Sequence, residues 1–116
     1  MYKLLALAFA AYFFATSSFA APRAESVEEC SIAADMAVVA QSLAHEQIHR
    51  PKAGAIMARI YDVSESERGQ ALLKEILDAA YLRSAAAGGT QSFPEELFTT
   101  CMGTDGNMDA ILGRRL

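Results

Sequence analysis

The chain of 116 residues is poor in the residue groups that mark nucleic-acid binding and nucleophilic catalysis. Its longest basic block is Arg114-Arg115 and its formal net charge is −4, so it offers phosphate backbones no basic patch. It contains no glycine-rich phosphate loop, and with only two cysteines and two histidines no nucleophile can be paired with a base. These absences argue against nucleic acid as a partner and leave few routes to catalysis.

Strand patterns are also missing from the sequence. No segment alternates apolar and polar residues over enough positions to predict a sheet, whereas the alanine-rich stretches between turn formers indicate helices. We therefore predict an all-α fold, a small bundle of about four helices. Their expected ranges are Ser26–Arg50, Lys52–Tyr61, Ser64–Ala86 and Ser92–Gly103.

The first of these helices should be the most enclosed element, because its polar wedge is narrow. Ser26 and Glu29 form a capping box at its start, and Pro51 should end it at Arg50. Projected at about 100° per residue, its apolar residues form two adjacent stripes. The first stripe contains Ile32, Met36, Val39 and Leu43, and the second contains Cys30, Ala33, Ala34, Ala37, Ala44 and Ile48. We expect both stripes in the core.

Turn formers and caps predict the remaining boundaries. Ser64 and Glu67 resemble a second capping box, Gly88-Gly89 should terminate the third helix, and Ser92 followed by Pro94 should start the fourth. These signals place a helical domain at residues 21–103.

The tail, residues 104–116, is rich in glycine and turn formers. We expect it to be mostly irregular, with at most a loosely docked last turn around Met108–Leu112. Residues Asp105–Asp109 begin like a calcium loop, but Ala110 stands where such a loop needs glycine. We interpret this segment as a turn.

Residues 1–20 are typical of a cleavable secretory signal peptide. Lys3 supplies a positive start, and the apolar run Leu4–Ala15 reaches only about 18 Å at about 1.5 Å per residue, short of a bilayer core of about 30 Å. Ser18 and Ala20 are the small residues that signal peptidase needs before a cut after Ala20. We expect a periplasmic or secreted protein with no membrane span after cleavage, whose formal net charge changes from −4 to −5 as Lys3 is lost. The alternative is that the segment stays uncleaved and serves as an anchor.

Cys30 and Cys101 are the only cysteines and lie near the two ends of the predicted domain. Disulfides persist in exported proteins, and only one intramolecular pairing is possible, so we predict a bond between them. The alternative is a pair of buried free thiols. A bond that closes a loop of about seventy residues would stabilise a small domain by about 4.4 kcal/mol on the chain-entropy estimate.

The HEQIH segment, residues 45–49, matches the H-E-x-x-H pattern, in which two histidines one helical turn apart bind zinc and the glutamate acts as a general base. A catalytic zinc needs a third protein ligand, and the chain has no further histidine. The remaining source is a carboxylate from a later helix, such as Glu67, Glu75 or Asp78. Peptidases of this type also hold their substrate on an edge strand, and no upstream sheet is predicted here.

The positions of the two histidines also have a structural explanation. Histidines in the last turns of a helix are favoured there by the helix dipole and the free carbonyl groups, which accounts for both His45 and His49. We therefore predict no metal, no cofactor and no catalytic residue. The alternative retains His45 and His49 as zinc ligands with Glu46 as the base.

The order of features resembles that of small uncharacterised periplasmic helical proteins of Gram-negative bacteria. It comprises a signal peptide, Cys30 in an alanine-rich helix, Ala80-Tyr81, a glycine-containing turn, and Phe93–Leu97 leading to Cys101. The cysteines, Ala80-Tyr81 and residues 108–112 are also similar to periplasmic immunity proteins that block type VI amidase effectors, although a Cys-x-Asp after the second helix cysteine is lacking. The second resemblance implies binding without catalysis, and neither supplies site residues.

Taken together, these patterns predict a small, soluble, exported, disulfide-closed helical protein that works by binding another protein, without catalysis. The alternative function is a zinc-dependent hydrolase or metal-binding protein that uses the HEQIH segment.

Overall fold

The computed structural model describes residues 23–85 and 92–112, and most of them lie in four helices. These are α2 (Val27–His45), α3 (Arg50–Tyr61), α4 (Glu67–Ala85) and α5 (Phe93–Gly103). No strand occurs in the two described ranges, and the predicted all-α bundle is confirmed. None of these helices is long and apolar enough to cross a membrane. The predicted signal peptide and the predicted helix stop at Gly88-Gly89 lie outside the described residues.

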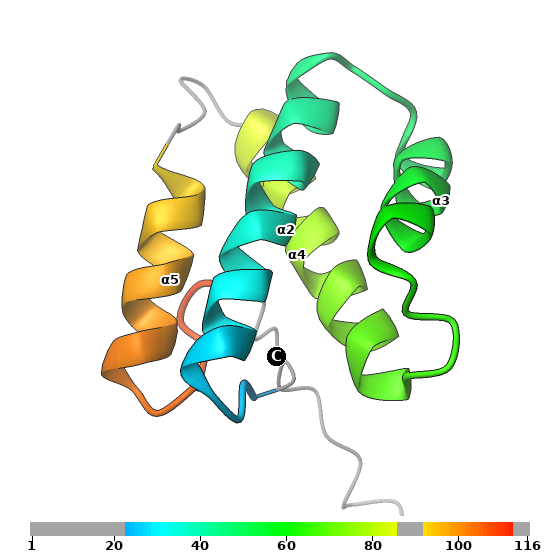
Figure 1. The fold of residues 1–116 in the computed structure, drawn as a ribbon. Coiled ribbons are helices and arrows are strands. Elements are labelled where there is room, and N and C mark those ends of the chain that lie inside the picture. The colour runs from blue at the N-terminus through cyan, green and yellow to red at the C-terminus, as the bar shows by residue number, and fades with distance from the viewer. Residues whose placement is uncertain (1–22, 86–91, 113–116) are drawn as a thin grey trace, which may run out of the picture.

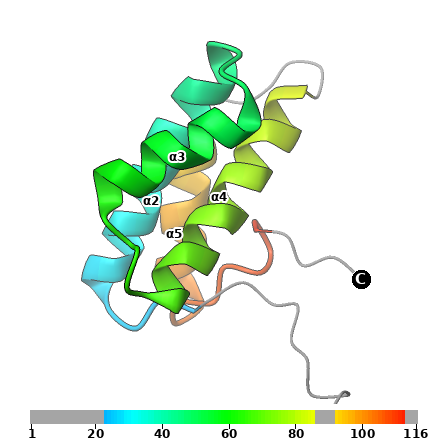
Figure 2. The same cartoon turned by 90° about the vertical axis from the view of Figure 1, so that its right-hand side faces the viewer.

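Helix α2 is the central element of the bundle. It packs against α4 and α5 most extensively, and it also contacts α3, which in turn contacts α4. α3 and α5 lie on opposite sides of α2 (Figure 1), and the turned view shows α3 alongside α2 and α4 (Figure 2). The buried face of α2 therefore forms the middle of the core.

This buried face consists mainly of alanines. Ala33, Ala37 and Ala40 have no exposed surface, and Met36 is 2% exposed. Such small side chains let neighbouring helices approach closely. The prediction of a core position is wrong for Ile32, which is 43% exposed. The reason is that α4 and α5 cover the alanine side of α2, which leaves Ile32 at the margin of the packed surface.

The first turn of α2 is held by a cap and a covalent bond. Ser26 Oγ accepts a hydrogen bond from the Glu29 N–H at 3.1 Å, and Glu29 Oε1 accepts one from the Glu25 N–H at 2.8 Å. The predicted disulfide is confirmed, since Cys30 is bonded to Cys101 of α5 with a Cα–Cα distance of 5.7 Å. Residues 71 positions apart in the chain are thereby joined.

The prediction that α2 runs to Arg50 is wrong. The helix ends at His45, Gln47 adopts a φ of +62°, and α3 begins at Arg50. Pro51 lies in the first turn of α3, where a missing N–H and a φ near −65° are compatible with a helix. The proline therefore belongs to the start of a new helix rather than to the end of α2.

The start of α4 also differs from the prediction. Ser66, rather than Ser64, caps the helix, because Ser66 Oγ accepts a hydrogen bond from the Gly69 N–H at 2.9 Å. α4 accordingly begins at Glu67. Val63, just before this turn, is only 9% exposed and belongs to the core.

The segment after α5 is part of the core, so the expectation of a loosely docked tail is wrong. α5 ends at Gly103 as predicted, and the residues that follow form turns without a regular helix. Met108 and Leu112 have no exposed surface, and the Leu112 N–H donates to the Met108 carbonyl oxygen at 2.8 Å. A bundle lined with alanine has few large side chains, and these two supply part of its apolar volume.

Gly106 joins the two ends of the described chain. Its carbonyl oxygen accepts a hydrogen bond from the Ala24 N–H at 2.9 Å, and its own N–H donates to the Cys101 carbonyl oxygen at 2.7 Å. Its φ is +87°, and a Cβ atom here would lie 2.0 Å from the Ala24 oxygen, so the position requires glycine. The predicted turn around Asp105 is confirmed, and the structure adds that the first and last parts of the described chain meet there.

Candidate functional site

The HEQIH segment does not form the helical pair that its pattern requires. His45 is the last residue of α2, Glu46 lies in the turn that follows, and His49 is the residue before α3. Two histidines four positions apart bind one zinc ion from a continuous helical turn, and here the chain leaves the helix between them. The interpretation that both histidines lie in the last turns of one helix is wrong for His49.

The proposed third zinc ligands are not gathered with these histidines. Among residues 23–85 and 92–112, no three His, Cys, Asp or Glu side chains form a group suited to a metal ion. Asp78 of α4 instead pairs with Arg50 of α3, whose Nε lies 3.0 Å from Oδ1, and with Lys74, whose Nζ lies 3.0 Å from Oδ2. Desolvation raises the pKa of Asp78, but the bonds to Arg50 and Lys74 outweigh it and lower that pKa. This carboxylate therefore attaches α3 to α4.

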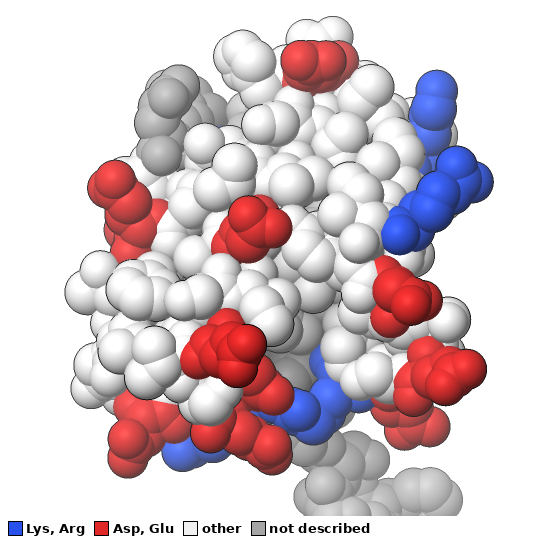
Figure 3. Space-filling model, in the orientation of Figure 1, with Lys and Arg blue, Asp and Glu red and all other residues white. Residues whose placement is uncertain are grey.

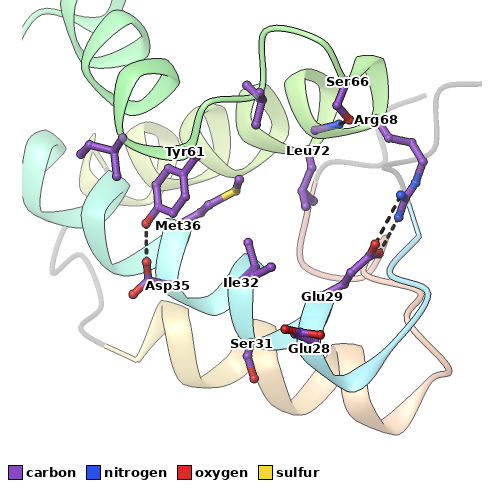
Figure 4. A pocket seen from close by; sticks show the side chains of 13 residues that line it. Glu28, Glu29, Ser31, Ile32, Asp35, Met36, Tyr61, Ser66, Arg68 and Leu72 are labelled. Atoms are coloured by element: carbon purple, nitrogen blue, oxygen red, sulfur yellow. Dashed lines mark hydrogen bonds and ion pairs between the residues drawn. The ribbon is translucent and has the colours of Figure 1, made fainter.

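A groove of about 530 Å³ lies between α2, α3 and the first turns of α4. Its apolar surface comes from three helices and the turn before α4, and consists of Ile32, Met36, Ile60, Val63 and Leu72. Met36 and Val63 are buried, whereas Ile32 is 43% and Ile60 is 55% exposed. Ile32, Met36 and Leu72 face the same opening in the close view (Figure 4). The groove therefore has a buried apolar base and exposed apolar walls.

Carboxylates dominate the rim of this groove. The Tyr61 hydroxyl donates to Asp35 Oδ2 at 2.5 Å, which links α3 to α2 (Figure 4). Burial, and then the neighbouring Asp35 carboxylate, raise the pKa of Tyr61, so its hydroxyl stays protonated as the donor. Arg68 Nη2 lies 2.6 Å from Glu29 Oε1, and no cation within the described ranges pairs with Glu28. Three carboxylates against one guanidinium leave the rim acidic.

The pair between Glu29 and Arg68 makes stability depend on pH. The hydrogen bond from Arg68, followed by that from the Glu25 N–H, holds the pKa of Glu29 below its ordinary 4.5. A carboxyl whose pKa is lowered by folding stabilises the protein above its unfolded pKa and loses that contribution as pH falls through the folded pKa. We expect the free energy of unfolding to decline below about pH 4.5, and Glu29→Gln to make this decline shallower.

Urea denaturation at a series of pH values measures this dependence. Glu65→Gln is the matched control, since Glu65 is exposed and lies outside the groove. Equal slopes below pH 4.5 for the wild-type protein and Glu29→Gln would contradict the assignment.

The apolar surface continues over α2 to the α5 side. Ser31 and Asp35 line both the groove and a shallower hollow between α2 and α5, to which Val38 and Phe98 contribute. Val38 is 49% exposed. The space-filling view shows a broad uncharged surface on this side of the molecule, interrupted by separate carboxylates (Figure 3). α2 therefore contributes apolar surface both to the core and to an exposed face.

Sequence reasoning did not identify this groove. It assigned Ile32 to the core, did not single out Asp35 or Arg68, and used Tyr61 only as the end of a predicted helix. One feature of the sequence indicated an exposed apolar surface. α2 is apolar around most of its circumference and has more apolar surface than its neighbours cover. That signal does not reveal which part of the surface stays exposed.

Comparisons of the chain with protein-family models, with curated proteins and with solved structures found no match. Function is therefore inferred from the geometry and charge of the groove.

Proposed function

We propose that this protein is exported and acts by binding another protein in the groove between α2, α3 and α4, without catalysing a reaction. The observation that carries this proposal is the exposure of Ile32 and Ile60 on two different helices, on either side of one cavity. Contiguous apolar surface with a polar rim is typical of sites where a partner docks. A groove of this size has room for several side chains of such a partner.

Two further features support a binding role in an exported protein. The Cys30–Cys101 disulfide fits an oxidising compartment, and residues 1–20 have the sequence pattern of a secretory signal peptide. The candidate catalytic motif is divided between the end of α2 and the start of α3. These observations favour a periplasmic or secreted binding protein over a hydrolase.

Site-specific photo-crosslinking in the producing cells tests this proposal. A photoreactive residue in place of Ile32 should yield adducts with a discrete partner protein, because this side chain is exposed in the groove. The same residue in place of Leu82 is the control, since Leu82 is 65% exposed on α4 and lies outside the groove. Adding Ile60→Asn to the Ile32 probe should reduce the adduct at least about tenfold by placing an uncharged polar group in the apolar wall.

Identical adducts from the Ile32 and Leu82 positions, or an adduct that is insensitive to Ile60→Asn, would refute the groove as the binding site. Circular dichroism of each variant should retain the wild-type helical signal, because all three substituted positions are exposed.

A further inference from the structure

We propose that the segment bound in the groove is a cationic amphipathic helix, whose apolar side chains contact Ile32 and Leu72 and whose two basic side chains, about two turns apart, pair with Glu28 and Asp35. This inference rests on the proposed function and specifies the chemistry of the partner.

The charge of the rim favours a basic partner. Glu28, Glu29 and Asp35 all line the groove, and Arg68 is the only cation that lines it within residues 23–85 and 92–112. Arg68 is already engaged by Glu29 at 2.6 Å and by the Arg23 carbonyl oxygen at 2.9 Å. Within the described part of the chain, Asp35 receives only the neutral Tyr61 hydroxyl, and neither it nor Glu28 takes part in an ion pair. A partner with basic side chains would supply the cations that pair with these two carboxylates.

The positions of these carboxylates set the spacing of the partner's charges. Glu28 and Asp35 are both in α2, seven residues apart. At about 1.5 Å per residue they are separated by about 10 Å along the helix axis. A second helix lying along the groove reproduces this separation with lysine or arginine residues seven positions apart. Its intervening apolar residues then lie over Ile32 and Met36.

A helix suits this groove better than an extended peptide. The backbone N–H and C=O groups of an extended peptide need hydrogen-bond partners, and the edge of a sheet would provide them. Residues 23–85 and 92–112 contain no strand, and most of the groove surface is apolar side chain. A helix satisfies its own backbone groups internally and presents only side chains to the groove.

Like charges disfavour two other occupants. A second copy of this chain packed groove against groove would bring its own Glu28 and Asp35 against the same acidic surface, and a surface of anionic lipid would meet the same carboxylates. Neither arrangement supplies the missing cations.

Binding of designed peptides to the oxidised exported protein tests the inference. The probe is a labelled amphipathic helix of about fifteen residues with a leucine stripe and two lysines seven positions apart. Its matched peptides carry glutamine in place of lysine, or the two lysines four positions apart. We expect the first peptide to bind about two- to thirty-fold more tightly than either control, and the preference to shrink as salt is raised.

Variants of the protein assign the effect to the two carboxylates. Glu28→Gln combined with Asp35→Asn should remove the preference for lysine, and the asparagine can still accept the Tyr61 hydroxyl. Glu46→Gln combined with Glu65→Gln changes the net charge equally at exposed sites outside the groove and should preserve the preference.

The outcomes separate this inference from the proposed function. Equal binding of the lysine and glutamine peptides overturns the inference, while a positive result from Ile32 crosslinking would still support the groove as a binding site. Binding to anionic vesicles, or an Ile32 adduct that proves to be a second copy of this chain, also overturns it. Preference for the peptide with seven-residue spacing, lost only in the Glu28→Gln and Asp35→Asn protein, supports it.

Discussion

Reduction of the Cys30–Cys101 disulfide is expected to lower the free energy of unfolding by about 4.4 kcal/mol. The bond joins residues 71 positions apart, and opening a loop of this length restores conformational entropy to the unfolded chain. Small domains have total stabilities of only about 5–15 kcal/mol, so this is a large share. Both cysteines are buried, at 3% and 0% exposure, so the reduced thiols remain packed in an otherwise unchanged core.

Urea denaturation of the protein with and without reductant measures this effect. The double variant Cys30→Ala/Cys101→Ala should resemble the reduced protein, and reductant should leave its unfolding midpoint unchanged. A loss of stability below about 1 kcal/mol on reduction would show that the bond contributes little and that α2 and α5 hold together by packing alone.

Replacement of Met108 by alanine should destabilise the protein by about 2–5 kcal/mol. Met108 has no exposed surface although it lies in an irregular segment after α5. Its truncation leaves a cavity in the core, and the surrounding helices are held by a disulfide that limits their collapse. The variant therefore tests whether the C-terminal segment is a structural part of the bundle.

Met102→Ala is the matched control for this substitution. The same side chain is removed, but Met102 is 43% exposed at the end of α5, so the expected loss is within about 0.5 kcal/mol. Thermal or urea unfolding compares the two variants directly. Similar small losses for both would mean that residues 108–112 are only loosely attached.

Much of the fold was predictable because it depends on local chemistry. Ser26 caps α2, Pro94 follows the start of α5, and glycine ends α5, each through the backbone preferences of one residue type. Where one residue is compatible with two local structures, the sequence alone does not decide between them. A proline such as Pro51 can end one helix or lie in the first turn of the next. Gln47, with a φ of +62°, interrupts the helix before the proline is reached, so Pro51 lies in the first turn of α3.

The site was less predictable than the fold, because exposure depends on which elements pack together. Ile32 and Met36 lie one turn apart and belong to the same apolar stripe, yet one is 43% exposed and the other 2% exposed. The rim contacts between Asp35 and Tyr61 and between Glu29 and Arg68 join residues 26 and 39 positions apart. No periodicity within one helix encodes such pairs.

The sequence by itself determined the helical class, the start of α2, the end of α3, both ends of α5 and the only possible disulfide, because these follow from backbone preferences and from the presence of two cysteines. Only the tertiary structure decided that the HEQIH segment is divided between two helices, that Met108 and Leu112 fill the core, and that an apolar groove with an acidic rim opens beside α2. The physical reason is that burial and charge pairing are properties of surfaces brought together by packing, and segments distant in the chain supply those surfaces.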